Sequence, residues 1–332
     1  MSTPKFKPNS LAYTLKDKFD YDVSALDAWT DNTLPTIVTD VIENSEFLNS
    51  MTLEEGVKGT KEIAMLTADV TLKAKAGCTP SPDGSVIFTG KDLTTRLLYA
   101  GIEFCNEDLN TKMTQILNTL GMKRQEGQLP APLDTILQAY LTKLLMKKAQ
   151  DVVLKGDTTS LDPELALFDG LIKLISNHAS VVEATSTETA IDETNGYDLA
   201  KLVYKAIPAE LFDNGINVAI YTGRTEAIAI LEQWNQANPY SQVEVPANGT
   251  SMRFMLPLLG IEVIALPQLT GTNKMFAIPI VLTYLGTDLM EDMSFDIKYD
   301  AYNDKLKSEA TFRLGTNFIF EQYFVRLELA TS

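Results

Sequence analysis

Two strand-like stretches joined by a turn-rich segment constrain the fold of this chain most. They span about residues 57 to 104 and are interrupted by the stretch GCTPSPDGS. The sequence VTLK at 70–73 alternates apolar and polar residues, and Val86 to Phe88 resume the strand pattern after the turn. A two-stranded hairpin alone is only marginally stable in water, so we expect this arm to rest on a neighbouring subunit. The pattern therefore predicts a protein that assembles with copies of itself.

A long amphipathic helix is predicted from Leu133 to Lys155, after two prolines that suit its start. Gly156, in the stretch KGD, follows as the expected stop. A helix of this length fits a spine across a flat subunit. The apolar stripe at helical spacing consists of Leu133, Ile136, Leu137, Tyr140, Leu141, Leu144, Leu145, Ala149 and Val152.

The second half of the chain alternates between helix and strand patterns and then becomes strand-rich. The stretches DLAKLVYKAI and TEAIAILEQW indicate helices, whereas NVAIYTG, GIEVIALP and MFAIPIVLTY indicate strands. Between them, NPYSQVEVPANGTS indicates a loop or a short hairpin. From about residue 295 to 329, apolar and polar residues alternate in three stretches, which predicts antiparallel strands with one solvated face.

The charge balance argues against several classes of partner. The 332 residues include 28 Lys and Arg and 44 Asp and Glu, a formal net charge of −16. Phosphate contacts need clustered basic residues, so the chain is a poor general binder of nucleic acid. The sequence has no run of about eighteen apolar residues, so we expect no membrane span. The N-terminal stretch lacks the apolar region of a signal peptide, so we expect folding in a cytoplasm.

Residues that usually carry chemistry are scarce. Cys78 and Cys105 are too few for a disulfide framework or a thiolate zinc site, and His178 is the single histidine. No Walker loop, GxGxxG or GxSxG motif occurs. The acidic stretches 192–198 and 291–300 lack the spacing of a calcium-binding EF-hand loop. We therefore expect no catalytic residue, no metal site and no cofactor.

Several ordered features resemble one protein family. They are an N-terminal arm, the long extended loop, a helix closed by KGD, the following FDGL, the stretch NVAIYTGRTEAIAILEQW, and terminal strands containing FRLG. This order resembles the major capsid proteins of tailed bacteriophages, a fold shared with encapsulins and the herpesvirus capsid floor. The resemblance covers most of the chain and is specific as an ordered pattern, but no single motif carries it. It implies an α+β fold with an N-terminal arm, an extended β-hairpin loop, a spine helix, and peripheral and axial domains.

By this resemblance, the domains follow the chain in five segments. Residues 1–56 would form the N-terminal arm, 57–96 the extended loop and 97–163 the peripheral domain with the spine helix. Residues 164–287 would form the axial domain, and 288–332 would return to the peripheral domain as C-terminal strands. Subunit contacts are expected at the loop tip and near the capsomer axes, at Lys75, Cys78, Pro80, Asp83, Gly84, Asn238, Tyr240 and Asn248.

The function implied is that of a structural head protein, not an enzyme. Its copies would form the pentamers and hexamers of an icosahedral virion shell that encloses double-stranded DNA without binding it tightly. Scaffolding, portal and decoration proteins are further possible partners, and assembly would take place in the host cytoplasm. Two alternatives stay open: an encapsulin-type shell around a cargo enzyme, and a carboxylate-dependent hydrolase, which would need a perturbed carboxylate pair in a deep pocket.

Overall fold

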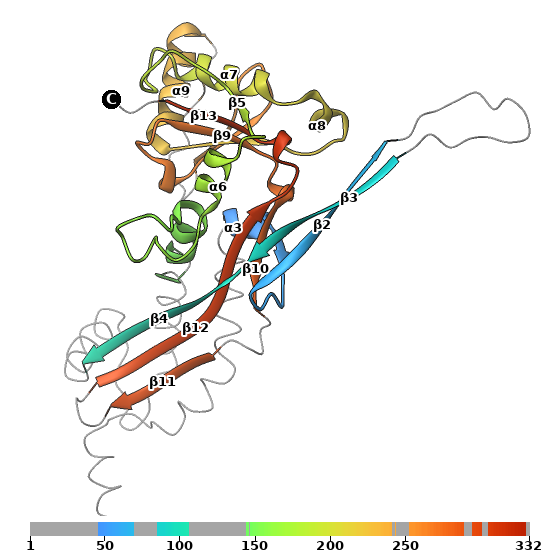
Figure 1. The fold of residues 1–332 in the computed structure, drawn as a ribbon. Coiled ribbons are helices and arrows are strands. Elements are labelled where there is room, and N and C mark those ends of the chain that lie inside the picture. The colour runs from blue at the N-terminus through green and yellow to red at the C-terminus, as the bar shows by residue number, and fades with distance from the viewer. Residues whose placement is uncertain are drawn as a thin grey trace, which may run out of the picture. The chain divides into compact units, whose positions relative to one another are not determined.

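A computed structural model describes residues 46–69, 85–105, 144–145, 147–240, 243, 252–288, 294–300 and 305–329. These residues form an α+β structure (Figure 1), as the resemblance implies. They divide into two compact units. One contains the described residues of Leu97–Ala149 and Asp288–Arg313, and the other contains those of Phe47–Arg96, Gln150–Thr287 and Leu314–Ser332.

A six-stranded mixed sheet forms the centre of the second unit. Its strands, in spatial order, are β5 (Val182–Glu183), β13 (Val325–Glu328), β9 (Lys274–Ile278), β6 (Ala219–Thr222), β8 (Glu262–Ala265) and β7 (Met252–Met255). The helices of this unit are α3 (Glu46–Ser50), α6 (Leu171–Asn177), α7 (Gly196–Ala206), α8 (Ala209–Asp213) and α9 (Arg224–Ala237). Short 3-10 turns lie at Pro267–Leu269, Ile280–Leu282 and Glu321–Tyr323.

The main core lies between this sheet and helices α7 and α9. Along each strand, every second residue points to the helices because side chains alternate between the two faces of a sheet. Ile220 of β6 stands in register with Val263 of β8 and Ala277 of β9, and all three are fully buried. Val203 of α7 and Ile230 of α9 pack in the same cluster, and both are fully buried. The segments DLAKLVYKAI and TEAIAILEQW are therefore helices, as predicted, and each packs an apolar face on the sheet.

The remaining strands form a hairpin and a second sheet. The hairpin pairs β2 (Thr60–Asp69) with β3 (Ser85–Thr94) in antiparallel register. In the other sheet, β10 (Thr283–Thr287) pairs in parallel with β1 (Thr52–Glu54) and antiparallel with one end of β12 (Lys305–Phe318). The other end of β12 pairs with β11 (Ser294–Asp300), and β4 (Arg96–Cys105) also pairs with β12. On β12, Ala310, Phe312 and Leu314 are buried and alternate with half-buried residues, as predicted.

Four details differ from the sequence prediction. The hairpin ends at Thr94, not near residue 104, because the chain leaves it at Thr95 and enters β4 of another sheet. The predicted strand MFAIPIVLTY is two strands, β9 and β10, since Pro279 lacks the N–H that a continued ladder needs. The last strand, β13, pairs with β9 and not with the other C-terminal strands. The strand β7 was not predicted.

The described residues include the end of the predicted spine helix. Residues 147–155 are helical, and the helix stops before Gly156, where the sequence predicts its end. The predicted apolar stripe includes Val152 but not Val153 or Leu154. All three are buried, so the last turn of the helix is buried on more than the predicted face. The part from Leu133 to Lys143 lies outside the described residues.

Candidate functional site

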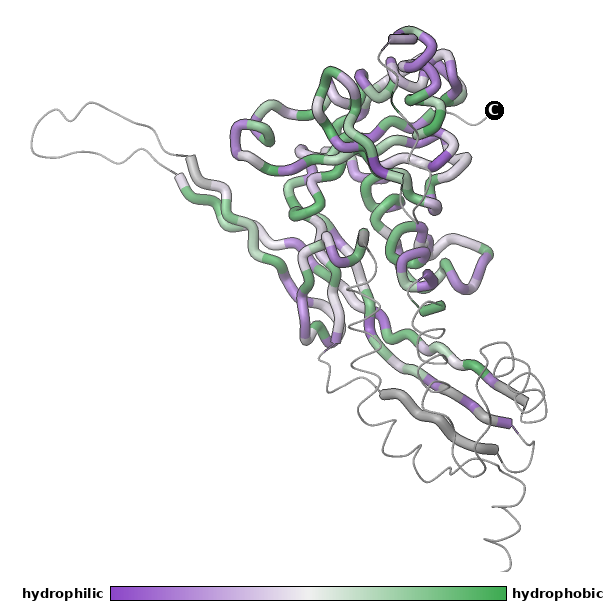
Figure 2. Tube along the Cα trace, turned by 180° about the vertical axis from the view of Figure 1, so that it is seen from behind, coloured by the Kyte–Doolittle hydropathy of each residue, from purple (hydrophilic) through white to green (hydrophobic). Residues whose placement is uncertain are grey.

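The outer face of the β2–β3 hairpin is the first candidate surface for assembly. Leu66 stands directly opposite Phe88, and Ala68 stands opposite Val86, so these four positions share one face. Leu66 is 55% exposed, Phe88 76% and Val86 57%. Figure 2 shows the hydrophobic colouring along this part of the hairpin. Three large apolar side chains on one exposed face form a surface that another molecule can cover.

The opposite face of the hairpin is anchored at its base, which we call the root. Ile63 and Leu93 are buried there and pack with Val57 and Ile319 in a small apolar cluster. Leu93 is completely buried. The hairpin therefore has two different faces: one joins the core at the root and exposes Ile87 further along, and the other carries the exposed Leu66, Val86 and Phe88.

Thr95 fixes the point where the chain leaves the hairpin. Its side chain is buried, and its hydroxyl donates to the carbonyl oxygen of Val57 at 2.7 Å. Its backbone N–H donates to the carbonyl oxygen of Gly59, also at 2.7 Å. These two bonds tie the end of β3 to the segment that precedes β2. The direction in which the hairpin leaves the unit is thus set by buried polar contacts as well as by apolar packing.

The glycine of the FRLG stretch has its role at the same root. A Cβ atom on Gly315 would lie 2.2 Å from the carbonyl oxygen of Thr94, which is closer than any real contact. Asn317, two residues later on β12, donates from its side chain to the carbonyl oxygen of Asp92 at 2.7 Å. Strand β12 therefore passes directly against the end of β3, and only glycine permits this approach.

An ion pair completes the root. Lys91 Nζ lies 2.7 Å from Glu321 Oε1 and 4.0 Å from the centre of the Phe318 ring, a cation–π geometry. His178 Nε2 lies 3.6 Å from the same carboxylate oxygen. Burial acts to raise the pKa of Glu321, but the hydrogen bond from Lys91, a backbone hydrogen bond and the nearby positive charges lower it overall. Glu321 is thus held ionised as an acceptor for the hairpin lysine.

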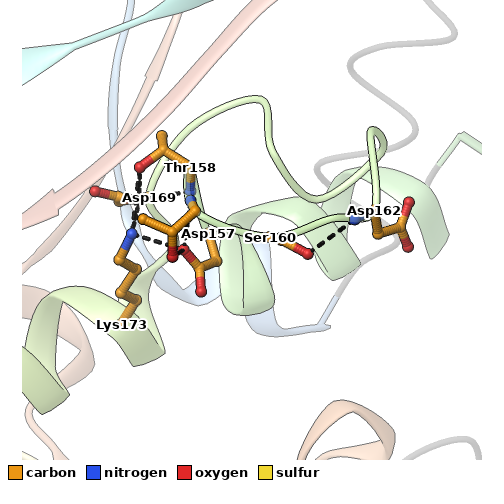
Figure 3. Close-up of polar contacts among 7 residues, drawn as sticks. Asp157, Thr158, Ser160, Asp162, Asp169 and Lys173 are labelled. Carbon is orange, nitrogen blue, oxygen red and sulfur yellow. Dashed lines mark hydrogen bonds and ion pairs between the residues drawn. The ribbon is translucent and has the colours of Figure 1, made fainter.

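The KGD and FDGL stretches form a second polar cluster, shown in Figure 3. Gly170 donates its N–H to the carbonyl oxygen of Gly156 at 2.7 Å, and a Cβ atom on Gly170 would lie 2.6 Å from Gly156 N. Lys173 Nζ lies 2.7 Å from Asp157 Oδ1 and 2.6 Å from Asp169 Oδ1. The hydrogen bond from Lys173, followed by those from Thr159, lowers the pKa of Asp157 to about 2. These contacts close the loop that follows the helix, and their role is structural.

The predicted contact residues fall into two groups. Lys75, Cys78, Pro80, Asp83, Gly84 and Asn248 lie outside the described residues. Asn238 is the C-cap residue of helix α9, and its side chain donates a hydrogen bond to the carbonyl oxygen of Trp234 at 3.1 Å. Tyr240 is fully exposed. The prediction for Tyr240 as a contact residue stays a prediction.

Sequence reasoning missed the residues that define the root and the outer face of the hairpin. Leu66, Lys91 and Thr95 are not among the predicted residues, and Phe88 is predicted only as part of a strand. A signal for the outer face was present, because Val86, Ile87 and Phe88 are apolar without alternation, which means that both faces of β3 carry apolar residues. Nothing in the local sequence signals Lys91 or Thr95, since their partners are 230 and 38 residues away in the chain.

The described residues bear on the sequence expectations about metal ions and about His178. Within them, no group of three or more His, Cys, Asp or Glu side chains could hold a metal ion. No helix in the described part is both long and apolar enough to cross a membrane. His178 touches Phe318 edge-on, with ring centres 5.8 Å apart, besides its contact with Glu321. It is therefore a packed side chain with a carboxylate partner.

Comparison with solved structures gives extensive similarity at low sequence identity. A chain of the satellite phage P4 procapsid matches with a TM-score of 0.59 and 12% identity, over 90% of this chain and 99% of that chain. A chain of a native GTA particle capsid matches with a TM-score of 0.56 and 11% identity, over 88% and 90%. The capsid of Myoviridae phage XM1 matches with a TM-score of 0.51 and 12% identity, over 86% and 91%. No protein-family model and no curated protein sequence matches this chain.

Proposed function

We propose that this chain, which has the α+β fold of tailed-phage major capsid proteins, is a structural shell protein and not an enzyme. The observation that carries the proposal is the hairpin: its root is fastened within the unit, while Leu66 and Phe88 remain exposed on its outer face. Exposed apolar surface of this kind is costly for a monomer and useful for an interface. A neighbouring copy that covers this face would remove the cost.

The fold and the charge support a finer assignment. Copies would assemble as pentamers and hexamers of an icosahedral shell around double-stranded DNA, within a virion built in the host cytoplasm. Scaffolding, portal and decoration proteins would be its partners. The net charge of −16 supports enclosure of DNA without tight binding, because an acidic wall repels phosphate. We assign residues 57–96 to the extended loop, 164–287 to the axial domain, and 97–163 with 288–332 to the peripheral domain, except that β13 completes the axial sheet.

The hydrolase alternative finds no support among the described groove-lining residues. The groove beside strands β7 and β8 contains one carboxylate, Glu262, and Arg253 Nη1 lies 3.5 Å from its Oε1. A glycosidase-type mechanism needs two carboxylates at a defined separation. This groove therefore lacks the pair that such chemistry requires.

Assembly of purified protein tests the proposal. We expect the wild-type chain to form closed particles visible by negative-stain electron microscopy. The Phe88→Ser and Leu66→Ser variants should remain unassembled, while the melting temperature of their subunits stays close to that of the wild type, because exposed substitutions change stability by only about 0.5 kcal/mol. Thr89→Ser, also exposed but on the other face of β3, is the matched control and should assemble normally. Normal particles from both apolar-face variants would refute the role of this face, and a strictly monomeric wild type would refute the function.

A further inference from the structure

The six-stranded sheet has a second face that the described residues cover only in part. Helices α7 and α9 cover the first face. On the second face, Tyr221 of β6 packs edge-on against Phe47 of α3, with ring centres 5.5 Å apart. Beside this contact, over strands β7 and β8, the described residues leave a groove of about 470 Å³.

The lining of the groove mixes apolar and polar side chains, and its charged residues are one Arg and one Glu. Arg253, Met255 and Glu262 form part of its lining on β7 and β8, and Met255 stands in register with Glu262. Arg253 Nη1 lies 3.5 Å from Glu262 Oε1, so the two charges largely cancel. Phe212 of α8 and Leu259 line the same groove. Met255 and Phe212 are both exposed, although each is a large apolar side chain.

Leu258 lies in the turn that borders this groove, next to Leu259. Its backbone has φ of +67°, in the left-handed region that favours glycine and asparagine. Its side chain is 87% exposed. The turn itself closes through backbone bonds, with Leu256 N donating to Ile261 O at 2.7 Å and Gly260 N donating to Leu256 O at 3.0 Å. Leucine is thus unfavourable here for both its backbone and its exposure, and outliers of this kind often mark functional positions.

We propose that this groove and Leu258 form an interface for a second copy of this chain, separate from the hairpin face. The inference rests on the proposed function, which requires copies to meet. With a net charge of −16, copies repel each other over most of their surface, and they approach best where a patch carries no net charge. The groove is such a patch, because the two charged residues of its lining, Arg253 and Glu262, form an ion pair and the other lining residues are uncharged.

Two features fit a second copy better than a small ligand. Strand β7 is the last strand of the described sheet, so the groove opens at a sheet edge. Phe212 and Met255, which line the groove, and Leu258, which is next to the lining residue Leu259, are also large apolar side chains that remain exposed. In addition, the hairpin face and the groove are two different surfaces of one unit. A contact between unlike surfaces of successive copies generates a closed ring when its rotation closes.

The first test separates stability from assembly at Leu258. Leu258→Asn keeps a residue that tolerates the left-handed backbone and removes the apolar side chain. We expect the melting temperature of unassembled subunits to stay equal or rise, while the yield of particles falls about tenfold, the effect of losing one good apolar contact. Met255→Glu should reduce the yield similarly. Leu161→Asn changes another fully exposed leucine, in the loop after Gly156, and should assemble like the wild type.

The second test identifies the occupant. A photo-crosslinking residue replaces Leu258 in particles made from a mixture of isotopically heavy and light chains. Heavy–light crosslinked peptides are expected and would show contact with a second copy. Crosslinks confined to residues 1–45 of the same chain would overturn the inference and make that segment the occupant. Normal assembly of both Leu258→Asn and Met255→Glu would also overturn the inference while leaving the proposed function intact. A wild type that never self-associates would overturn both the inference and the proposed function.

Discussion

Lys91 of the hairpin and Glu321 of the C-terminal segment form an ion pair of 2.7 Å, with both side chains less than one-fifth exposed. The same lysine lies over the ring of Phe318. These contacts join β3 to the end of β12, which are distant in the chain and adjacent at the hairpin root. They make the orientation of the hairpin sensitive to single polar substitutions.

We expect Lys91→Met to destabilise the unassembled subunit by about 1–3 kcal/mol, because it leaves the carboxylate of Glu321 partly buried without its lysine. Hydrogen exchange should accelerate in 60–69 and 85–94 and stay unchanged in helices α7 and α9. The double variant Lys91→Met with Glu321→Gln should recover part of the loss, since it removes the uncompensated charge. If the single and double variants unfold at the same denaturant concentration, the pair does not stabilise the root.

Thr95 and its neighbour Thr94 provide a matched pair of substitutions. Thr95→Val should cost about 1–3 kcal/mol, because the carbonyl oxygen of Val57 loses its buried donor. Thr94→Val should cost much less, since the Thr94 hydroxyl contacts Thr60 at an exposed position. Chemical denaturation of the unassembled subunit measures both. Equal losses for the two variants would show that the buried hydroxyl has no special role.

Gly170→Ala should destabilise the loop that follows the predicted spine helix. Its new methyl group would meet the backbone of Gly156 and Leu154 at less than 3 Å, and backbone atoms cannot move aside as a flexible side chain can. We expect a cost of about 1–3 kcal/mol, typical of overpacking. Leu161→Ala, at a fully exposed position of the same loop, is the control and should leave the melting temperature nearly unchanged.

The loop should also show a defined pH dependence. The pKa of Asp157 falls from 3.8 to about 2 in the folded protein. Because the folded pKa is the lower one, the stabilisation is complete above pH 3.8 and is lost as the pH falls towards 2. Asp157→Asn should therefore flatten the dependence of unfolding free energy on pH in this window, and Lys173→Met should flatten it in part. A variant Asp157→Asn that keeps the wild-type slope would contradict this role.

Local sequence patterns predict where helices and strands lie better than they predict which strands pair with one another. The helices α7 and α9 and the strands β6, β8 and β12 lie where periodicity and turn residues placed them, because each has a clear apolar face. The stretch MFAIPIVLTY predicts one strand, although Pro279 within it lacks the N–H that a continuous strand needs. Strand β7 is not predicted, because it begins directly after NPYSQVEVPANGTS, whose turn residues indicate a loop or a short hairpin.

The sequence by itself determined the order of elements, the hairpin, the helix stop at Gly156 and the scarcity of catalytic groups. Those features depend on neighbouring residues or on composition. Only the tertiary structure decided that β13 joins the six-stranded sheet, that Lys91 meets Glu321, and which hairpin face stays exposed. Strand pairing and buried polar contacts join residues far apart in the chain, and many partners satisfy the same local pattern. The packing of the whole unit decides which of these partners actually pair.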